Sequence, residues 1–450
     1  MKTKGRESRR RTTAVAAAVA RETRTPWWPY ALAAVIAVAA AFWTYGPVLH
    51  GAFLFDDYVF PFALPNFAAP LSAWIGPVRP VLYFTFWINA QLSKDDPYSY
   101  HVVNVLFHCI TSGLIFLIVR RMLEWSRADR LRRDLLAGFA AAVFLLHPIQ
   151  TEAVAYLAGR SEALSVMFFF AAYAVFLYRG EPAVGWRKVA AVLLLFALAL
   201  LSKEHAVALP ALLLLTDYWW NPGFSVRGIR DNWKLYAPVA VGAVLGVAFF
   251  WRIITSAESA GFGLKDFTWY QYFFTQCRAL FVYLREFLIP ANLTADWDFP
   301  VSRTILDRGA IAGLAALLAL AGLAWRYRRR FPLASFGFFA FLVLMAPTSS
   351  IVPIRDTIAE RRLYLAMPGL LLIAVDLLAR LKLDRKALAT ACLVVVCLEA
   401  AAAHARAAVW SDPLTLWQDT ARKSPNKPRV RFQLGFAYYA SIPNNSLSLL

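Results

Sequence analysis

Two adjacent carboxylates and two adjacent arginines are the residues of this sequence best placed to do chemistry. Asp56 and Asp57 follow the first apolar stretch, and Arg361 and Arg362 immediately precede a later one. Burying a carboxylate costs several kcal/mol unless it is paired or solvated. An acidic pair at the end of an apolar span is therefore either a solvated stop signal or a functional site, and position alone leaves both open.

The arginine pair predicts an anionic partner. The loop Pro347 to Tyr364 carries Arg355, Arg361 and Arg362 on the side of the chain that is otherwise poor in basic residues. Arginines against a span on that side oppose the usual bias of short loops, so an anion is expected to offset their cost. Phospholipid headgroups and a lipid-linked phosphate are the two candidates.

Two further polar clusters interrupt apolar sequence. One follows His147-Pro148 and contains Glu152, Arg160 and Glu162, and the other is the segment 202–205, which contains Lys203 and Glu204. The first is either a helix break with a local ion pair or the wall of a polar pocket. The second is either a tight turn or part of the same pocket, since four polar residues are more than a turn requires.

The composition predicts that these residues sit on a membrane protein. The chain has 450 residues, 60% of them hydrophobic and 17% charged, with a mean hydropathy of +0.51. A net charge of +19 is compatible with nucleic-acid binding in general. Here the basic residues lie between apolar runs, so membrane orientation explains them better and no nucleic-acid partner is expected. The four cysteines have neither zinc-site nor disulfide spacing and are expected to be packing residues.

The apolar runs predict about eleven transmembrane helices in an all-α polytopic fold. A helix needs about 20 residues to cross the hydrocarbon core. The expected cores are 30–46, 102–119, 135–147, 163–178, 189–201, 206–220, 235–251, 309–325, 332–346, 363–379 and 387–403.

Basic residues predict which side each loop occupies. With a cytoplasmic tail at 1–29, the cytoplasmic segments hold 28 of the 47 Lys and Arg residues. The N terminus is then cytoplasmic and the C terminus extracytoplasmic, with large outer loops at 47–100 and 252–308. The segment 266–290 is expected to be an interfacial or re-entrant helix.

A retained signal anchor is favoured over a cleaved signal peptide for the N-terminal segment. The Ala- and Arg-rich composition suggests a bacterial inner membrane.

The segment 411–450 changes to polar sequence beyond the last span. Its stretch Arg431 to Tyr439 fits the first helix of a tetratricopeptide repeat, in which Leu-Gly-x-x-Tyr packs one helix on the next. About half a repeat is present. Because such repeats need about three units to bury their faces, the segment is expected either to stop early or to dock elsewhere.

Taken in order, the polar motifs resemble those of the transmembrane and tetratricopeptide-repeat-containing O-mannosyltransferases and their bacterial relatives. The resemblance covers about 45–440. Its signatures are Phe55-Asp56-Asp57, Arg79-Pro80, His101 with Asn104 and His108, His147 to Val154, Gly159 to Glu162, Ser202-Lys203-Glu204 and Ala359 to Leu365. The departure lies at the C terminus, where family members carry several repeats, and it affects acceptor binding more than catalysis.

The resemblance implies a GT-C type membrane glycosyltransferase fold over about 30–405. It also implies an inverting transfer of a sugar, mannose or another hexose, from a polyprenyl-phosphate carrier to a hydroxyl acceptor such as protein Ser or Thr. Asp56 or Asp57 would be the general base. Arg361 and Arg362, followed by Arg79 and Arg160, would bind the leaving phosphate. The other pocket candidates are His101, His147, Glu152, Glu162, Lys203, Glu204 and Glu360. No cofactor is required, although adjacent aspartates are also able to bind Mg²⁺ or Mn²⁺.

Two other classes of function remain open from the sequence. A multi-span transporter or lipid-linked sugar flippase would need ionisable groups deep in its helices. Only Asp217, Asp376 and Glu399 lie within the expected cores, and two of them are near cytoplasmic ends. A membrane-anchored scaffold that presents the repeat helix would leave the loop charges unexplained.

Overall fold

The computed structural model describes residues 26–59, 69–76, 78–126, 129–180, 182–256 and 261–442, with only the backbone of 59 and 245–256. Most of the predicted basic tail 1–29 therefore lies outside the described residues. The same holds for parts of the predicted loops 47–100 and 252–308, and for the end of the segment 411–450.

A helix is present at each of the eleven predicted spans. The apolar runs become helices because a buried backbone must pair its own N–H and C=O groups. These helices are α2 (Trp28–Thr44), α5 (Pro97–Trp125), α6 (Arg130–Leu146), α8 (Arg160–Leu177), α9 (Trp186–Leu200), α10 (Leu209–Trp220), α12 (Trp233–Ser256), α14 (Ala310–Arg326), α15 (Pro332–Met345), α16 (Leu363–Arg380) and α17 (Arg385–Val409).

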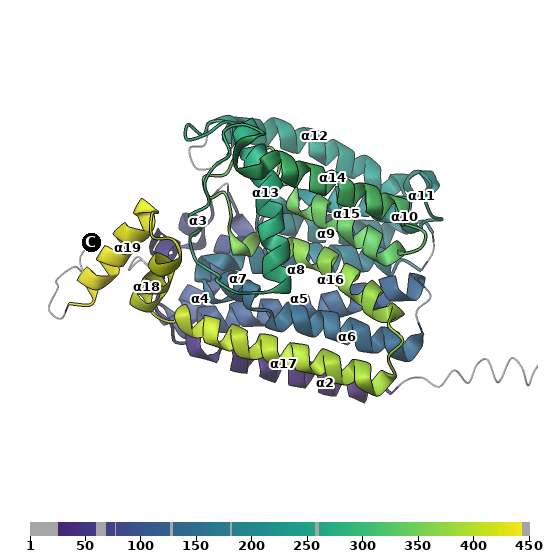
Figure 1. Cartoon of the computed structure of the whole chain (residues 1–450), viewed down its shortest axis with the longest axis horizontal. Coiled ribbons are helices and arrows are strands. Elements are labelled where there is room, and N and C mark those ends of the chain that lie inside the picture. The colour runs from purple at the N-terminus through teal and green to yellow at the C-terminus, as the bar shows by residue number, and fades with distance from the viewer. Residues whose placement is uncertain are drawn as a thin grey trace, which may run out of the picture.

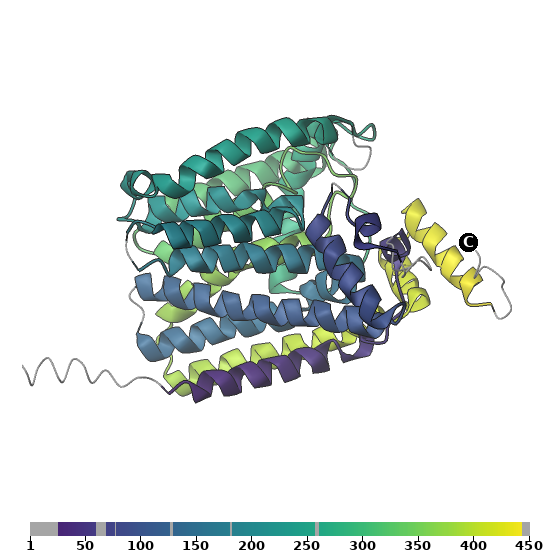
Figure 2. The same ribbon diagram turned by 180° about the vertical axis from the view of Figure 1, so that it is seen from behind.

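The long helices lie side by side in one bundle (Figures 1 and 2). Within the described part of the chain, five helices are long and apolar enough to cross a membrane, or six if one bent pair forms a single span. The all-α membrane architecture is thus supported, whereas the number of eleven spans and the GT-C fold stay predictions. Helices α15 and α16 approach closely where Gly337 faces Gly369, since a side chain on Gly337 would collide with the Gly369 carbonyl oxygen.

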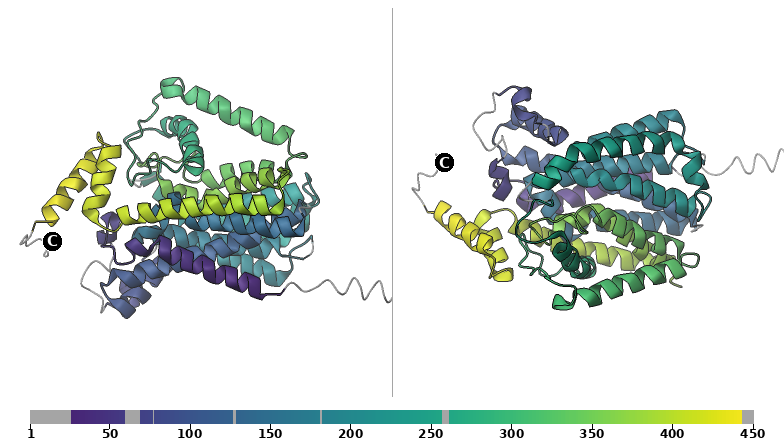
Figure 3. Two further views of the ribbon diagram at one scale, coloured as in Figure 1. Left: turned by 60° about the horizontal axis from the view of Figure 1, so that its bottom comes forward. Right: turned by 90° about the horizontal axis from the view of Figure 1, so that it is seen from above.

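Helix α13 (Trp269–Leu288) has a different orientation from its neighbours. It runs across the axis of the bundle, and Figure 3 shows it nearly end-on from above. It is not among the candidate membrane spans of the described residues. The interfacial or re-entrant position of this segment stays a prediction.

One end of the bundle carries the short elements and is called the α18–α19 end below. Helices α18 (Pro413–Lys423) and α19 (Pro428–Ala440) lie beyond it, and α3 (Leu71–Trp74) and α4 (Pro80–Ser93) lie at the same end on the other side of the bundle (Figures 1 and 3). The chain also bends there by 47° between α6 and the segment Pro148–Ala155, which ends in α7 (Thr151–Ala155). The break at Pro148 was predicted. His147 fixes it, because its Nδ1 accepts a hydrogen bond from the Ile149 N–H at 3.1 Å.

The predicted sidedness can be tested on exposed positions at the two ends. Ile351 is exposed in the loop that follows α15, and Arg329 is exposed between α14 and α15. With the exposed Cys397 replaced by Ser, a cysteine at 351 should react with an impermeant thiol reagent only from outside the cell, and one at 329 only from inside. Labelling of position 351 from the cytoplasm would reverse the orientation.

Candidate active site at one end of the bundle

The two adjacent aspartates face different surroundings. Asp57 is buried, and its Oδ2 and Oδ1 accept hydrogen bonds from the backbone N–H groups of Leu54 at 2.9 Å and Ala158 at 2.8 Å. Asp56 is exposed, and its backbone N–H donates to the Tyr156 hydroxyl at 2.8 Å. Among the described residues, no hydrogen bond or ion pair engages the Asp56 carboxylate. Asp56 therefore offers a free carboxylate, while Asp57 fixes the loop to the segment after α7.

Burial also changes the protonation of Asp57. Burial raises the pKa of the Asp57 carboxyl to about 8, and Asp56 adds to the increase, while the N–H groups of Leu54 and Ala158 act against it. A carboxyl with such a pKa holds its proton at neutral pH. Since a protonated group cannot accept a second proton, Asp56 is the better general base of the pair.

Arg361 meets a buried carboxylate at the end of the bundle. Glu152 on α7 is 2% exposed, and its Oε2 accepts from the Arg361 N–H at 2.8 Å while its Oε1 pairs with the Arg361 guanidinium. The Arg361 side chain is 30% exposed. Its guanidinium is thus held in place and remains accessible on one side.

A narrow cleft joins these groups. Its aromatic wall consists of Phe55, Tyr156, Trp410 and Trp417, which come from the aspartate loop, the segment after α7, the end of α17 and α18. Its charged wall consists of Glu152, Asp296, Asp356, Arg361 and Arg429. Asp56 itself does not line the cleft, but its neighbour Phe55 and its hydrogen-bond partner Tyr156 do. The cleft has a volume of about 20 Å³, so it does not enclose a sugar in this structure, but it places aromatic faces beside carboxylates and guanidinium groups, the group types that bind sugars and phosphates.

Arg362, unlike Arg361, points away from the cleft. Its guanidinium donates to the Tyr272 hydroxyl at 3.1 Å and to the Thr357 carbonyl oxygen at 3.1 Å, and it also contacts the Asp356 carbonyl oxygen. These contacts attach the loop before α16 to α13. Arg362 therefore has a structural position, and of the two adjacent arginines only Arg361 lines the cleft.

Arg160 is fully buried on α8. It donates to the side-chain oxygens of Asn104 at 2.8 Å and Asn89 at 2.6 Å, and to the Tyr100 carbonyl oxygen at 2.8 Å. Its guanidinium carbon lies 4.4 Å from the centre of the Phe86 ring. The guanidinium thus joins α8 to α4 and α5 and does not line the cleft.

Replacing Arg160 with Lys should lower thermal stability without changing the affinity for a polyprenyl phosphate. An ammonium cannot reproduce the planar fork, so acceptors among Asn104, Asn89 and Tyr100 would lose their partner, at about 1–3 kcal/mol for each buried group. A melting curve and a binding isotherm on the same variant check this. Weakened phosphate binding with an unchanged melting temperature would return Arg160 to the phosphate site.

Four of the remaining predicted residues form ion pairs outside the cleft. Arg79 pairs with Glu204 through two hydrogen bonds of 2.9 and 2.8 Å. Glu162 pairs with Lys203 at 2.5 Å and with His205 at 3.0 Å. The predicted clusters at 147–162 and 202–205 do come together, through Glu162 and Lys203. Neither pair lines the cleft.

His101, His147 and Glu360 are buried at the same end of the bundle. The Nε2 of His147 contacts the Phe287 carbonyl oxygen at 3.1 Å, which joins the break after α6 to α13. Glu360 accepts from the Thr294 backbone N–H. These two contacts hold loops around the cleft in place.

Within the described part of the chain, the aspartate pair is not accompanied by the further ligands that a metal site would need. Among the described residues, no group of three or more His, Cys, Asp or Glu side chains could hold a metal ion. Both oxygens of Asp57 accept backbone N–H groups, so the pair presents one free carboxylate rather than two.

Three charged residues of the cleft were not predicted as site residues from the sequence. Asp296 belongs to a segment in which no motif was identified, Arg429 lies just before the repeat motif, and Asp356 was noted only as part of its loop. Arg429 Nε and Nη2 bind both carboxylate oxygens of Asp296 at 2.6 and 2.8 Å, and Nη2 binds Asp356 at 2.7 Å. An acidic residue beside the expected interfacial helix and a basic residue at the start of the repeat helix were the available signals.

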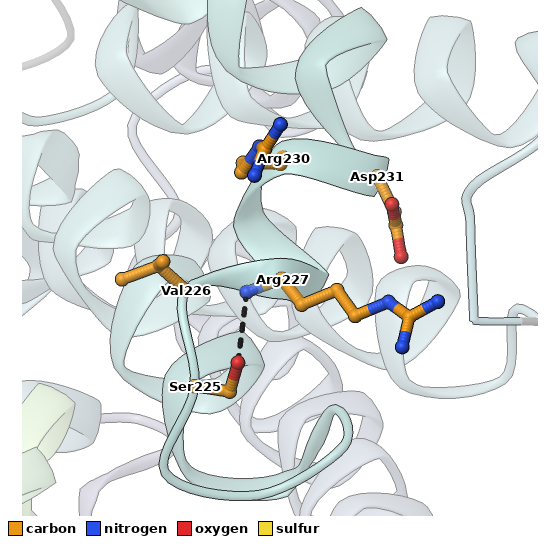
Figure 4. A pocket seen from close by; sticks show the side chains of 5 residues that line it. All are labelled: Ser225, Val226, Arg227, Arg230 and Asp231. Atoms are coloured by element: carbon orange, nitrogen blue, oxygen red, sulfur yellow. Dashed lines mark hydrogen bonds between the residues drawn. The ribbon is translucent and has the colours of Figure 1, made fainter.

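A second hollow, of about 460 Å³, lies at the opposite end of the bundle. It lies beside the short helix α11 (Arg227–Asp231) and is lined by Ser225, Val226, Arg227, Arg230 and Asp231 (Figure 4). The Ser225 hydroxyl accepts the Arg227 backbone N–H at 3.2 Å, and the Arg227 side chain extends away from it. None of the predicted site residues lines this hollow, so the candidate site is the cleft.

Comparison with known proteins gives a consistent set of relatives. A protein O-mannosyl-transferase of Caenorhabditis elegans is 26% identical over 370 residues, which are 79% of this chain and 50% of the relative. Protein O-mannosyl-transferase Tmtc2 of Drosophila melanogaster is 29% identical over 269 residues, or 56% of this chain and 27% of the relative. Protein O-mannosyl-transferase TMTC3 of Mus musculus is 33% identical over 150 residues, or 33% of this chain and 15% of the relative.

The chain spans half the length of the first of these relatives and less of the others. No protein-family model and no solved structure matches it. The curated homologues of this chain are thus protein O-mannosyl-transferases of the TMTC family, in agreement with the resemblance of its ordered polar motifs.

Proposed function

We propose that the chain is an inverting glycosyltransferase that moves a hexose, mannose in the first instance, from a polyprenyl-phosphate carrier to a Ser or Thr hydroxyl of a protein. The reaction would occur at the α18–α19 end, on the extracytoplasmic face of the membrane. The names of the homologues support sugar transfer to protein. The apolar helices support a donor that arrives within the membrane.

The approach of the Asp56 loop, through Phe55, and of Arg361 to one cleft is the observation that carries this proposal. The two residues are far apart in the sequence and come from different loops. The contacts of Asp56 with Tyr156 and of Arg361 with Glu152 bring both loops to the segment around α7. A free carboxylate and an accessible guanidinium at one cleft are the two groups that transfer from a sugar phosphate requires.

Each group has a role in the transfer. The acceptor hydroxyl gives its proton to the Asp56 carboxylate as its oxygen forms a bond to the anomeric carbon. The bond between that carbon and the phosphate oxygen breaks, and the carrier leaves as polyprenyl phosphate. Arg361 would stabilise the charge that develops on this phosphate. Because attack and departure occur on opposite faces of the sugar, the configuration inverts and one carboxylate is enough.

Two of the carboxylates inside the bundle give little support to the transporter hypothesis. Asp217 pairs with Arg179 at 2.8 Å, and Asp376 pairs with Arg380 at 2.9 Å, one turn further along α16. Both carboxylates therefore have cationic partners near the ends of their helices. Such pairs explain the two aspartates without a translocation path.

The donor class can be tested directly. Purified protein in lipid nanodiscs should transfer radiolabelled mannose to a Ser/Thr-rich peptide from polyprenyl-phosphate mannose and not from a nucleotide-activated mannose. Transfer from the nucleotide sugar alone would overturn the proposed donor.

A further inference from the structure

The helix pair α18–α19 is attached to the candidate site by a cluster of ion pairs. Arg429, in the first turn of α19, binds the buried Asp296 through two hydrogen bonds and binds Asp356 through a third. Lys427 pairs with Asp296 and lies 3.9 Å from Asp356. Burial opposes ionisation of Asp356, yet Arg429, Arg361 and Lys427 together lower the pKa of its carboxyl. These charges stabilise the docked position of α19.

Hydrogen bonds to backbone groups support the same docking. The Lys423 ammonium donates to the Leu293 carbonyl oxygen at 2.7 Å, and the Ser424 hydroxyl accepts the Asp298 backbone N–H at 3.2 Å. The Lys427 ammonium donates to the Trp297 carbonyl oxygen at 3.0 Å. The turn between α18 and α19 therefore binds the loop that follows α13 at several points.

Arg429 also contacts the aspartate loop. Its guanidinium carbon lies 5.4 Å from the centre of the Phe55 ring, and that ring lies 5.7 Å from the Trp417 ring. Phe55 has a φ of +46°, a left-handed conformation that a bulky residue adopts only when its surroundings impose it. Because Phe55 directly precedes Asp56, α18 and α19 pack against the residue next to the proposed general base.

The same residue reaches the arginine side of the cleft. Asp356 binds Arg429 at 2.7 Å and lies 3.9 Å from the Arg361 guanidinium. Arg429 therefore neighbours both candidate groups, through Phe55 on one side and Asp356 on the other. A guanidinium that already faces two carboxylates is a poor phosphate ligand, so its effect would pass through these neighbours.

We propose that Arg429 is a positioning residue of the transferase, and that docking of α19 sets the relative geometry of Asp56 and Arg361. The proposal rests on the proposed function and deepens it. It assigns the C-terminal helix pair a part in the chemical step, so whatever moves that pair would control turnover.

Kinetics provide the first test, with a matched control on the same helix. Arg429→Ala should lower kcat by about 10- to 100-fold, because small displacements of reacting groups have effects of this size, with little change in the KM for the donor. Arg429→Lys keeps the charge without the planar fork and should recover part of the rate. Arg431→Ala removes an exposed arginine two residues away, whose Nε donates to the Pro425 carbonyl oxygen at 2.7 Å rather than to Asp296 or Asp356, and should match the wild type. A loss in Arg429→Ala no larger than that in Arg431→Ala would overturn the inference.

Thiol reactivity provides a second test that does not depend on activity. With Cys397 replaced by Ser, an Asp56→Cys variant should react with a water-soluble maleimide several-fold faster when combined with Arg429→Ala, and at an unchanged rate when combined with Arg431→Ala. Equal rates in the two combinations would contradict the positioning role. A wild-type protein that transfers no sugar would instead contradict the proposed function, so the two failures are distinguishable.

Discussion

Asp56→Asn should lower the turnover number by about 10²- to 10⁴-fold, since this is the usual contribution of a general base. Asn has nearly the same shape as Asp and cannot accept the proton of the acceptor hydroxyl. The Asp56 side chain is exposed, and within the described chain its carboxylate has no bonded partner. The melting temperature and the affinity for polyprenyl phosphate should therefore stay near those of the wild type.

Two other aspartates serve as controls for this result. Asp95→Asn removes an exposed carboxylate outside the cleft and should leave turnover unchanged. The Asp57 carboxylate accepts hydrogen bonds from two backbone N–H groups. In Asp57→Asn the side-chain NH₂ would face one of them, so two donors would meet and stability should fall by about 1–3 kcal/mol. Full activity of Asp56→Asn would remove the general-base role. Activity restored by added Mn²⁺ would make Asp56 a metal ligand instead.

Arg361→Ala should have the second large effect, a loss of about 10²- to 10³-fold in kcat, as expected when one donor to a developing charge is removed. Donor affinity should also fall. The substitution leaves the buried Glu152 without its cationic partner, which typically costs about 3–5 kcal/mol of stability. Single-turnover rates and a binding isotherm for polyprenyl phosphate, measured below the melting temperature, separate these effects.

A double variant distinguishes phosphate binding from folding. Glu152→Gln together with Arg361→Ala removes the uncompensated charge and should regain much of the stability, while phosphate affinity stays low. Arg362→Lys keeps a charge at the adjacent position, whose guanidinium faces Tyr272 and Thr357. It should affect stability more than affinity. Recovery of phosphate affinity in the double variant would place the phosphate elsewhere, with Arg79 as the next candidate.

The helices and the general location of the site could be predicted from the sequence because both depend on local patterns. Long apolar runs mark helices, and polar motifs between them mark loops, so the approach of the loops around Asp56, Glu152 and Arg361 to one end of the bundle was expected. The break at Pro148 was also a local signal. The TMTC homologues agree with the ordered motifs.

The partner of each charge could not be predicted, since it depends on residues that the fold brings together from distant segments. Arg160 and Arg361 both lie where an apolar helix begins. Arg160 meets amide and carbonyl oxygens in the interior, whereas Arg361 meets Glu152 beside the cleft. The difference between Asp56 and Asp57 arises from the backbone N–H groups of Leu54 and Ala158, which the Asp57 carboxylate accepts and no residue pattern indicates. Arg429 was missed because its partners Asp296 and Asp356 lie far away in the sequence.

The anomeric configuration of the product tests the central proposal most directly. Wild-type protein should be incubated with a polyprenyl-phosphate mannose of known configuration and a Ser/Thr peptide, and the glycopeptide examined by NMR. The predicted result is a peptide-linked mannose whose anomeric configuration is opposite to that of the donor, formed by the wild type and by Asp95→Asn and strongly reduced with Asp56→Asn. A product that retains the configuration of the donor, or equal product from Asp56→Asn, would contradict transfer by a single displacement with Asp56 as the base.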